Sequence, residues 1–221
     1  MRRFDTVIFD LDGTLLDTID DLRTAIVYAF GVSGDELSRE QTLAGINFGV
    51  EYLLKNSAEV LGVKEYDMAL MKKRFSEKYA ECFTDKTAPF EGMTELLKKL
   101  KAEGYKIGVF SNKIDAFVKK LCECKFESGM IDAARGECEG VPVKPDPTGA
   151  HLMMESLGVT DKSKIAYVGD SNVDVYTAQN AGFYCIGVAW GYRPPEMLAE
   201  LGADKIAYNA KELYEIITEE I

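Results

Sequence analysis

The chain opens with a short apolar run that gives way abruptly to acidic residues. Val7, Ile8 and Phe9 are followed directly by Asp10-Leu11-Asp12-Gly13-Thr14. A short apolar run bounded by a glycine-containing turn is typical of a buried strand. Because side chains alternate along an extended chain, Asp10 and Asp12 point to the same side. The pattern predicts two carboxylates at the end of a buried strand.

Between residues 17 and 86 the apolar positions recur at helical spacing. The first helix closes at Gly31, and a capping box at residues 38–41 opens a short second helix. A third helix begins near Val50 and ends at Gly62, and a fourth covers 68–82. This stretch is long enough to form a small helical bundle inserted into another domain.

From Pro89 onward, helices and apolar strands alternate. We expect helices at 93–103, 114–122, 147–157, 173–181, 196–201 and 211–219, and strands at 106–110, 130–131, 164–168, 184–188 and 205–208. Alternation of this kind is typical of a parallel sheet with helices on both faces. The expected fold is therefore α/β, with a doubly wound, Rossmann-like parallel-sheet core at 1–16 and 87–221 and a small α-helical domain inserted at 17–86.

Polar residues follow three of the expected strands at the point where each strand ends. They are Asp10 and Asp12, then Ser111 and Asn112, then Asp170 and Asp174, with Lys144 in a loop before a helix. The carboxyl ends of parallel strands meet at one edge of the sheet, so these side chains are expected to converge. Carboxylates brought together there repel each other and lose hydration, an arrangement that a divalent cation and a proton-transfer task would use.

Charge narrows the classes of partner. The 221 residues carry a formal net charge of −11, and the pI is about 4.7. Such a chain is poorly suited to bind nucleic acid or an anionic membrane surface. An acid interrupts the N-terminal apolar run, and no apolar run is long enough to span a bilayer. We therefore expect a cytoplasmic protein without a signal peptide, and a monomer by default.

Cysteine and histidine usage excludes two further kinds of site. The five cysteines are odd in number and scattered, which does not suit a disulfide framework or a zinc site. The single histidine, His151, falls in a helical pattern, so a histidine-based catalytic triad is not expected.

Four motifs occur in an order that resembles the haloacid dehalogenase superfamily of phosphotransferases. They are Asp10-Leu11-Asp12-Gly13-Thr14, Ser111-Asn112, Lys144-Pro145 and Gly169-Asp170-Ser171-Asn172-Val173-Asp174. The helical stretch lies where that family inserts its C1-type cap. The chain looks most similar to the phosphoglycolate phosphatase-like branch, which shares the segments at 89–92 and 190–192.

The resemblance implies a role for each acid. Asp10 would be the nucleophile, and Asp12 would be general acid and then general base. Mg²⁺ would lie between Asp10, the backbone carbonyl of Asp12, and Asp170. Asp174, one helical turn further on, would support the metal or Lys144 without contacting the substrate.

The resemblance also implies a phosphate-binding set and a partner. The phosphate oxygens would be held by Gly13, Thr14, Ser111, Asn112 and Lys144. The expected activity is that of a Mg²⁺-dependent phosphatase acting through an aspartyl-phosphate on a small phosphorylated metabolite of the phosphoglycolate kind.

Several other activities are compatible with the same residues. A sugar-phosphate mutase of the β-phosphoglucomutase kind, a pyrophosphatase and a nucleotidase would share this core. A dehalogenase of the family lacks the second aspartate of the first motif, so Asp12 favours phosphoryl chemistry. A phosphorylatable receiver module would need neither Ser111 and Lys144 nor the inserted helices.

Substrate choice is the least specified property. The loop at 44–49 carries Gly45 and Asn47 and is a candidate specificity loop, although a plain interhelical turn explains it equally well. Arg193 or Lys55 could meet a substrate carboxylate or be surface charges. The remaining charges are assigned structural roles: the acids at 17, 20 and 21 to capping the first helix, and the lysines at 113, 119 and 120 to a solvated face.

Overall fold

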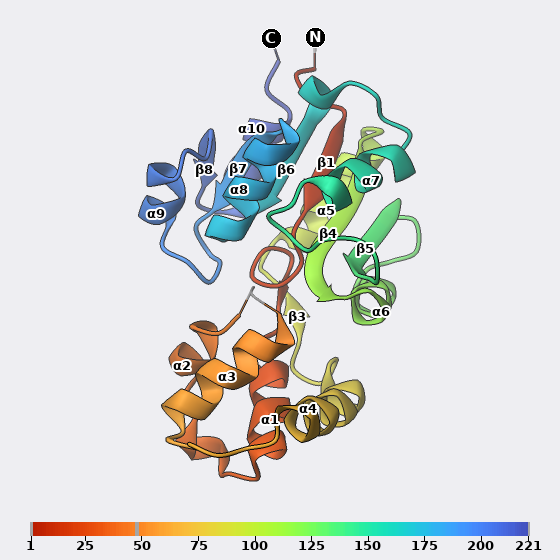
Figure 1. Ribbon diagram of the computed structural model, residues 1–221. Coiled ribbons are helices and arrows are strands. Elements are labelled where there is room, and N and C mark those ends of the chain that lie inside the picture. The colour runs from red at the N-terminus through yellow and green to blue at the C-terminus, as the bar shows by residue number, and fades with distance from the viewer. Residues whose placement is uncertain (1, 47–48, 221) are drawn as a thin grey trace. The chain divides into compact units, whose positions relative to one another are not determined.

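The computed structural model describes residues 2–46 and 49–220 and divides the chain into two compact units (Figure 1). One unit consists of residues 1–16 and 89–221, and the other of residues 17–88. The larger unit contains the acidic motifs and the smaller one contains the inserted helices. The boundary lies two residues beyond the expected position, at residue 88 instead of 86.

The larger unit is built on a six-stranded parallel sheet. Its strands are β1 (Thr6–Phe9), β4 (Lys106–Ile114), β5 (Ala133–Glu137), β6 (Ile165–Gly169), β7 (Tyr184–Val188) and β8 (Lys205–Ala207). Their order in the sheet is β5-β4-β1-β6-β7-β8. β1 lies between β4 and β6, so the chain proceeds to one side of β1 and later to the other. Ligands of such sheets bind beyond the carboxyl ends of the strands where this reversal occurs.

Helices follow the strands of this sheet. They are α5 (Met93–Ala102), α6 (Asp115–Lys125), α7 (Thr148–Ser156), α8 (Asn172–Ala181), α9 (Pro195–Glu200) and α10 (Ala210–Ile217). One buried cluster joins Ile8, Phe110 and Tyr167 of the sheet to apolar residues of α7, α8 and α9. Val7 and Phe9 point to the opposite face. α5 and α10 pack on each other, and α5 also contacts β4. The doubly wound α/β fold expected from the sequence is confirmed.

Two strands differ from the prediction. β4 continues past Phe110 to Ile114, with a shift of register between these two residues. The neighbouring strand is Ala133–Glu137, so the prediction of a strand at 130–131 was wrong. The sequence of this strand, AARGE, has little apolar character. It is extended because it pairs with β4, and because the amide of Gly136 donates to the Asp115 carboxylate at 2.9 Å.

The smaller unit contains the four expected helices. They are α1 (Ile19–Phe30), α2 (Arg39–Leu43), α3 (Val50–Val60) and α4 (Met68–Cys82), with a short 3₁₀ helix, η1 (Gly34–Glu36), after α1. Ser38 caps α2 with the predicted capping box, and Gly31 ends α1 in a left-handed conformation. Short strands β2 (Leu16–Asp17) and β3 (Ala88–Pro89) pair with each other where the chain enters and leaves this segment.

Asp21 does more than complement the dipole of α1. It lies in the first turn of that helix, as expected, and its side chain is buried. Its carboxylate accepts hydrogen bonds from the amides of Lys86 and Thr87 at 2.8–3.1 Å and from the Thr87 hydroxyl at 2.7 Å. One buried acid therefore ties the start of the helical unit to its last residues.

Replacing Asp21 by alanine is expected to destabilise the protein by about 2–4 kcal/mol, because several buried donors lose a charged acceptor at once. Urea unfolding followed by circular dichroism measures the change. Asp20→Ala is the matched control, since Asp20 lies in the same turn but its side chain is 38% exposed. A loss no greater for Asp21→Ala than for Asp20→Ala would contradict this role.

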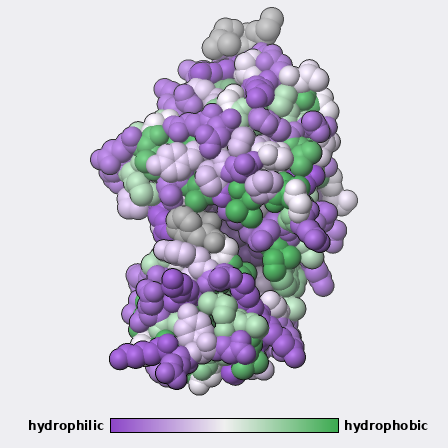
Figure 2. Space-filling model, in the orientation of Figure 1, coloured by the Kyte–Doolittle hydropathy of each residue, from purple (hydrophilic) through white to green (hydrophobic). Residues whose placement is uncertain are grey.

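Figure 2 shows mainly hydrophilic side chains on the face in view, with small and scattered apolar areas between them. Among residues 2–46 and 49–220, the structure contains no helix that is both long and apolar enough to cross a membrane.

Candidate active site

The first motif forms a tight loop after β1. The Asp10 amide donates to the carbonyl of Val168 at 2.8 Å, which holds the end of β1 against β6. The Leu11 carbonyl then accepts from the amides of residues 14, 15 and 16. Gly13 has a φ of 87°, and a Cβ at this position would lie 2.4 Å from a carboxylate oxygen of Asp170. Glycine is therefore required both by the backbone conformation and by the space that Asp170 occupies.

Asp170, directly after β6, is held from two sides. Its Oδ1 accepts from the Thr14 hydroxyl at 3.1 Å and its Oδ2 from the Tyr192 amide at 2.8 Å. A Cβ on Gly191 would approach the Asp170 Cβ to 2.1 Å, so this glycine permits the close passage of the loop after β7. In the same loop, the indole nitrogen of Trp190 donates to the Thr14 carbonyl at 3.0 Å. The segment at 190–192 thus orients Asp170.

Asp174 lies in the first turn of α8 and caps that helix. Its Oδ2 accepts from the amide and the hydroxyl of Ser171 in a capping box. Its Oδ1 accepts from Lys144 at 2.6 Å and from the Tyr167 hydroxyl at 3.3 Å. One oxygen therefore stabilises the helix, and the other faces the site.

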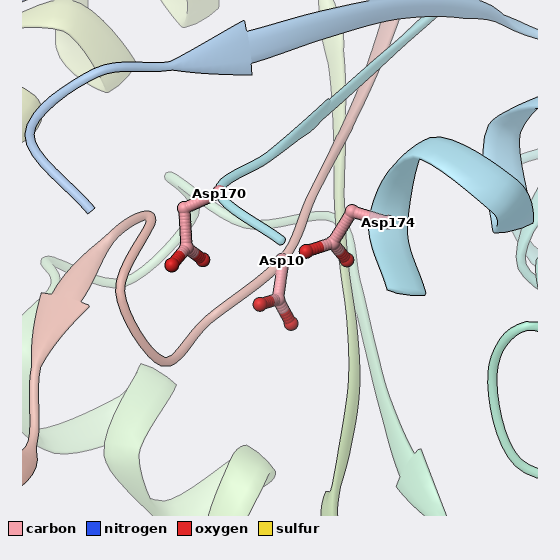
Figure 3. A group of neighbouring side chains, drawn as sticks. All are labelled: Asp10, Asp170 and Asp174. Atoms are coloured by element: carbon pink, nitrogen blue, oxygen red, sulfur yellow. The ribbon is translucent and has the colours of Figure 1, made fainter. Parts of the chain in front are cut away.

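Three carboxylates meet at the end of the sheet. Asp10, Asp170 and Asp174 each offer an oxygen atom within 4.8 Å of the others, and all three are buried. Figure 3 shows the three carboxylates gathered in one place, from the end of β1, the end of β6 and the start of α8.

Lys144 provides a buried positive charge beside these acids. Its Nζ donates to Asp10 at 2.8 Å, to Asp174 at 2.6 Å and to the carbonyl of Phe110 at 3.3 Å. The backbone of Lys144 is fixed by Asn112, whose side-chain amide accepts from the Lys144 amide and donates to its carbonyl. The Asn112 side chain therefore positions Lys144, while a contact of the Asn112 backbone amide with phosphate stays a prediction. This positioning role was not predicted.

Burial and mutual repulsion determine the ionisation of the acids. Burial, and next the Asp174 carboxylate, raise the pKa of Asp10 well above its usual range. The same two causes raise the pKa of Asp170 to about 7. Burial alone would lower the pKa of Lys144, but the carboxylates of Asp10 and Asp174 raise it well above its usual value. Three buried acids beside one lysine fit an additional cation, and their oxygen atoms suit a hard divalent ion.

The raised pKa of Asp170 predicts how metal-free protein responds to pH. Between 3.8, the ordinary value, and about 7, the folded state binds a proton that the unfolded state has lost. Stability from this group is therefore lost as the pH rises through that interval. In the presence of EDTA, the melting temperature of the wild type should fall relative to that of Asp170→Asn from pH 4 to pH 7, the window set by the 3.8 and about-7 values.

Mg²⁺ should reduce this difference, since a cation replaces the proton. Melting temperatures measured across the pH range with EDTA and with Mg²⁺ check both statements. Parallel curves for the wild type and Asp170→Asn in EDTA would contradict them.

Asp12 is paired with a residue that was expected to face solvent. The Nζ of Lys113 lies 2.8 Å from Asp12 Oδ1, and the two side chains are only 8% and 9% exposed. The prediction of a solvated face was therefore wrong for Lys113, whereas Lys119 and Lys120 are exposed. Ser111 is buried, and its hydroxyl accepts from the Lys113 amide at 3.2 Å.

The candidate specificity loop is only partly described. Gly45 follows α2, where a Cβ would lie 3.2 Å from the Cα of Leu53, so this glycine allows the loop to pass close to α3. Asn47 lies outside the described residues. The assignment of these two residues to substrate choice stays a prediction.

The chain also matches a known protein family. The model of the haloacid dehalogenase-like hydrolases matches residues 7–188, which spans the acidic motifs and the helical insertion. The chain belongs to this family.

Similar members of the family are phosphatases. This hydrolase is 30% identical to a phosphoglycolate phosphatase of Yersinia pestis over 94% of the chain and 90% of the relative. It is 27% identical to the N-acetylmuramic acid 6-phosphate phosphatase of Pseudomonas aeruginosa over 97% and 95%.

The crystal structure of a similar protein points to the same class of enzyme. A candidate phosphoglycolate phosphatase from Lactobacillus delbrueckii subsp. bulgaricus shares 33% identity with this hydrolase, and each chain is fully covered with a TM-score of 0.88. This hydrolase is a phosphatase of the haloacid dehalogenase type, that is, a phosphoric monoester hydrolase.

Proposed function

We propose that this phosphatase hydrolyses small phosphomonoesters of the phosphoglycolate class and uses Mg²⁺. The observation that carries the proposal is the buried group of Asp10, Asp170 and Asp174, two of which, Asp10 and Asp174, contact the ammonium of Lys144. The relatives named above, phosphatases of phosphoglycolate and of a sugar-acid phosphate, support the substrate class.

In the proposed reaction a carboxylate oxygen of Asp10 attacks phosphorus while the bond to the ester oxygen breaks, giving an aspartyl-phosphate. Asp12 donates a proton to the leaving oxygen, and the alcohol departs. Asp12 then accepts a proton from a water molecule that attacks phosphorus, which releases inorganic phosphate and restores Asp10. Bringing a carboxylate to a phosphate dianion requires positioning and charge neutralisation more than any other effect.

The proposed binding groups surround Asp10. Ser111, Lys144 and the backbone amides of Gly13, Thr14 and Asn112 would hold the phosphate oxygens. Asp10, the carbonyl of Asp12, and Asp170 would hold Mg²⁺, with Asp174 directly beside them. When bound, the ion supplies positive charge that offsets the charge of the phosphoryl oxygens.

A phosphate-release screen with Mg²⁺ tests the proposal. The panel contains phosphoglycolate, N-acetylmuramic acid 6-phosphate, hexose phosphates, nucleoside monophosphates and pyrophosphate, with Asp10→Asn as the blank. We expect Mg²⁺-dependent release that is fastest for phosphoglycolate or a similarly small ester. Isomerised sugar phosphate without release would identify a mutase instead, and release from pyrophosphate or nucleotides alone would identify those activities. No turnover of any compound would overturn the proposal.

A further inference from the structure

The pair of Lys113 and Asp12 is a second buried ion pair at the site, separate from the one that Lys144 makes. Both side chains are less than a tenth exposed, and the Nζ–Oδ1 distance is 2.8 Å. Neither the motifs nor the reaction above assign Lys113 a role. An ammonium in this position is costly to bury unless it meets negative charge.

The backbone around Lys113 is fixed by its neighbours. β4 and β5 are irregular here, since their register shifts between Phe110 and Ile114. A Cβ on Gly136 would lie 2.3 Å from the Lys113 carbonyl oxygen, so β5 approaches this residue as closely as a glycine allows. The Lys113 amide is also bonded to the Ser111 hydroxyl. The backbone of Lys113 is therefore held in place by the neighbouring strand and by Ser111.

The two buried lysines differ in what they contact. Lys144 donates to Asp10, to Asp174 and to the Phe110 carbonyl. It is directed at the nucleophile and the acids behind it. Lys113 is directed at Asp12, the residue that hands a proton to the leaving group in the proposed function. The positive charge of Lys113 therefore lies on the leaving-group side of the reaction.

We propose that Lys113 is a specificity-determining residue that selects phosphate esters whose leaving group carries a carboxylate next to the ester carbon. This inference rests on the proposed function. The ester oxygen must lie at Asp12 to receive its proton, and in such a substrate the carboxylate carbon is bonded to the carbon that carries this oxygen. The carboxylate then comes within reach of the ammonium that already contacts Asp12, and Lys113 bridges the two.

The test compares two esters with the same carbon skeleton, phosphoglycolate and ethylene glycol monophosphate, which has a hydroxymethyl group in place of the carboxylate. The full chain with Mg²⁺ is assayed for kcat and KM as wild type, Lys113→Met, Lys113→Gln and Lys113→Arg. Lys119→Met is the matched control, because Lys119 is exposed and pairs with Asp115 on α6.

We expect the wild type to prefer phosphoglycolate by about 100-fold in kcat/KM, the effect of one desolvated charge pair. Lys113→Met and Lys113→Gln should lose most of this preference, chiefly through a higher KM for phosphoglycolate. Turnover of the neutral ester is also expected to fall in these variants, because Asp12 loses this partner, so the readout is the ratio of kcat/KM for the two esters. Lys113→Arg should restore part of the preference. Circular dichroism checks that each variant is folded.

Three results would overturn the inference. They are a wild type that treats the two esters alike, an unchanged preference in Lys113→Gln, and an equal loss for both esters, which would make Lys113 only a support for Asp12. The proposed function fails separately, by the absence of phosphate release from any ester in the wild type.

Discussion

The Asp10→Asn variant is expected to release no phosphate above background, a fall in kcat on the order of 10⁴-fold or more. An amide oxygen is a far weaker nucleophile than a carboxylate, and the other acid of the same loop, Asp12, already serves as general acid and base in the proposed reaction. Single-turnover and steady-state phosphate release at saturating substrate measure the effect.

The stability of Asp10→Asn separates loss of chemistry from loss of fold. Asp10 is a carboxylate whose charge is opposed by burial and by Asp174, so its removal should leave the metal-free melting temperature unchanged or higher. Asp5→Asn makes the same exchange at an exposed position just before β1 and should have wild-type activity. Retention of more than about a tenth of the wild-type kcat by Asp10→Asn would exclude Asp10 as the nucleophile.

The Lys144→Met variant is expected to lose both stability and activity. Methionine fills a similar volume but leaves Asp10 and Asp174 without the ammonium that now lies 2.8 and 2.6 Å from them. Breaking a buried ion pair in this way costs about 3–5 kcal/mol. The loss of a fixed charge beside the proposed phosphate site should lower kcat/KM by about 10³-fold. Denaturant unfolding and phosphate release measure the two effects.

Adding Mg²⁺ separates the two losses expected for Lys144→Met, the loss of stability and the loss of activity. Excess Mg²⁺ should recover part of the lost stability, since a cation compensates the buried carboxylate charge that Lys144 no longer balances, but it should not recover activity. Lys119→Met, at an exposed ion pair on α6, should change the free energy of unfolding by less than about 1 kcal/mol. An equally small change for Lys144→Met would contradict a role for Lys144 in balancing the acids.

The convergence of the acids could be predicted because it depends on local pattern and on one general rule. The apolar runs before Asp10 and Asp170 identify strands from a few residues each, and parallel strands bring their ends to one edge. The capping of α2 by Ser38 was equally local. In these segments the local sequence favours the same structure as the surrounding fold, and the prediction was confirmed.

The remaining features depend on partners far along the chain. β5 has a weak strand pattern and is extended because β4 pairs with it. The Asp21 carboxylate accepts from the Lys86 amide, 65 residues later, and the Asn112 side chain bonds to the backbone of Lys144, 32 residues away. In the sequence, Lys113 resembles any lysine near the start of a helix. Its partner, Asp12, lies 101 residues earlier in the chain. Composition and periodicity contain no signal for such pairings, because they are made by tertiary packing alone.

The place of β1 in the sheet has a consequence for how the protein is made at the ribosome. β1, which leads into Asp10, is synthesised before the other strands of the sheet, but it is flanked by β6, which begins only at residue 165. Until then one side of this strand has no partner, and the amide of Asp10 lacks the Val168 carbonyl to which it donates. Nascent chains ending before that point should therefore be unable to assemble the acids, so that catalytic competence arises late in translation.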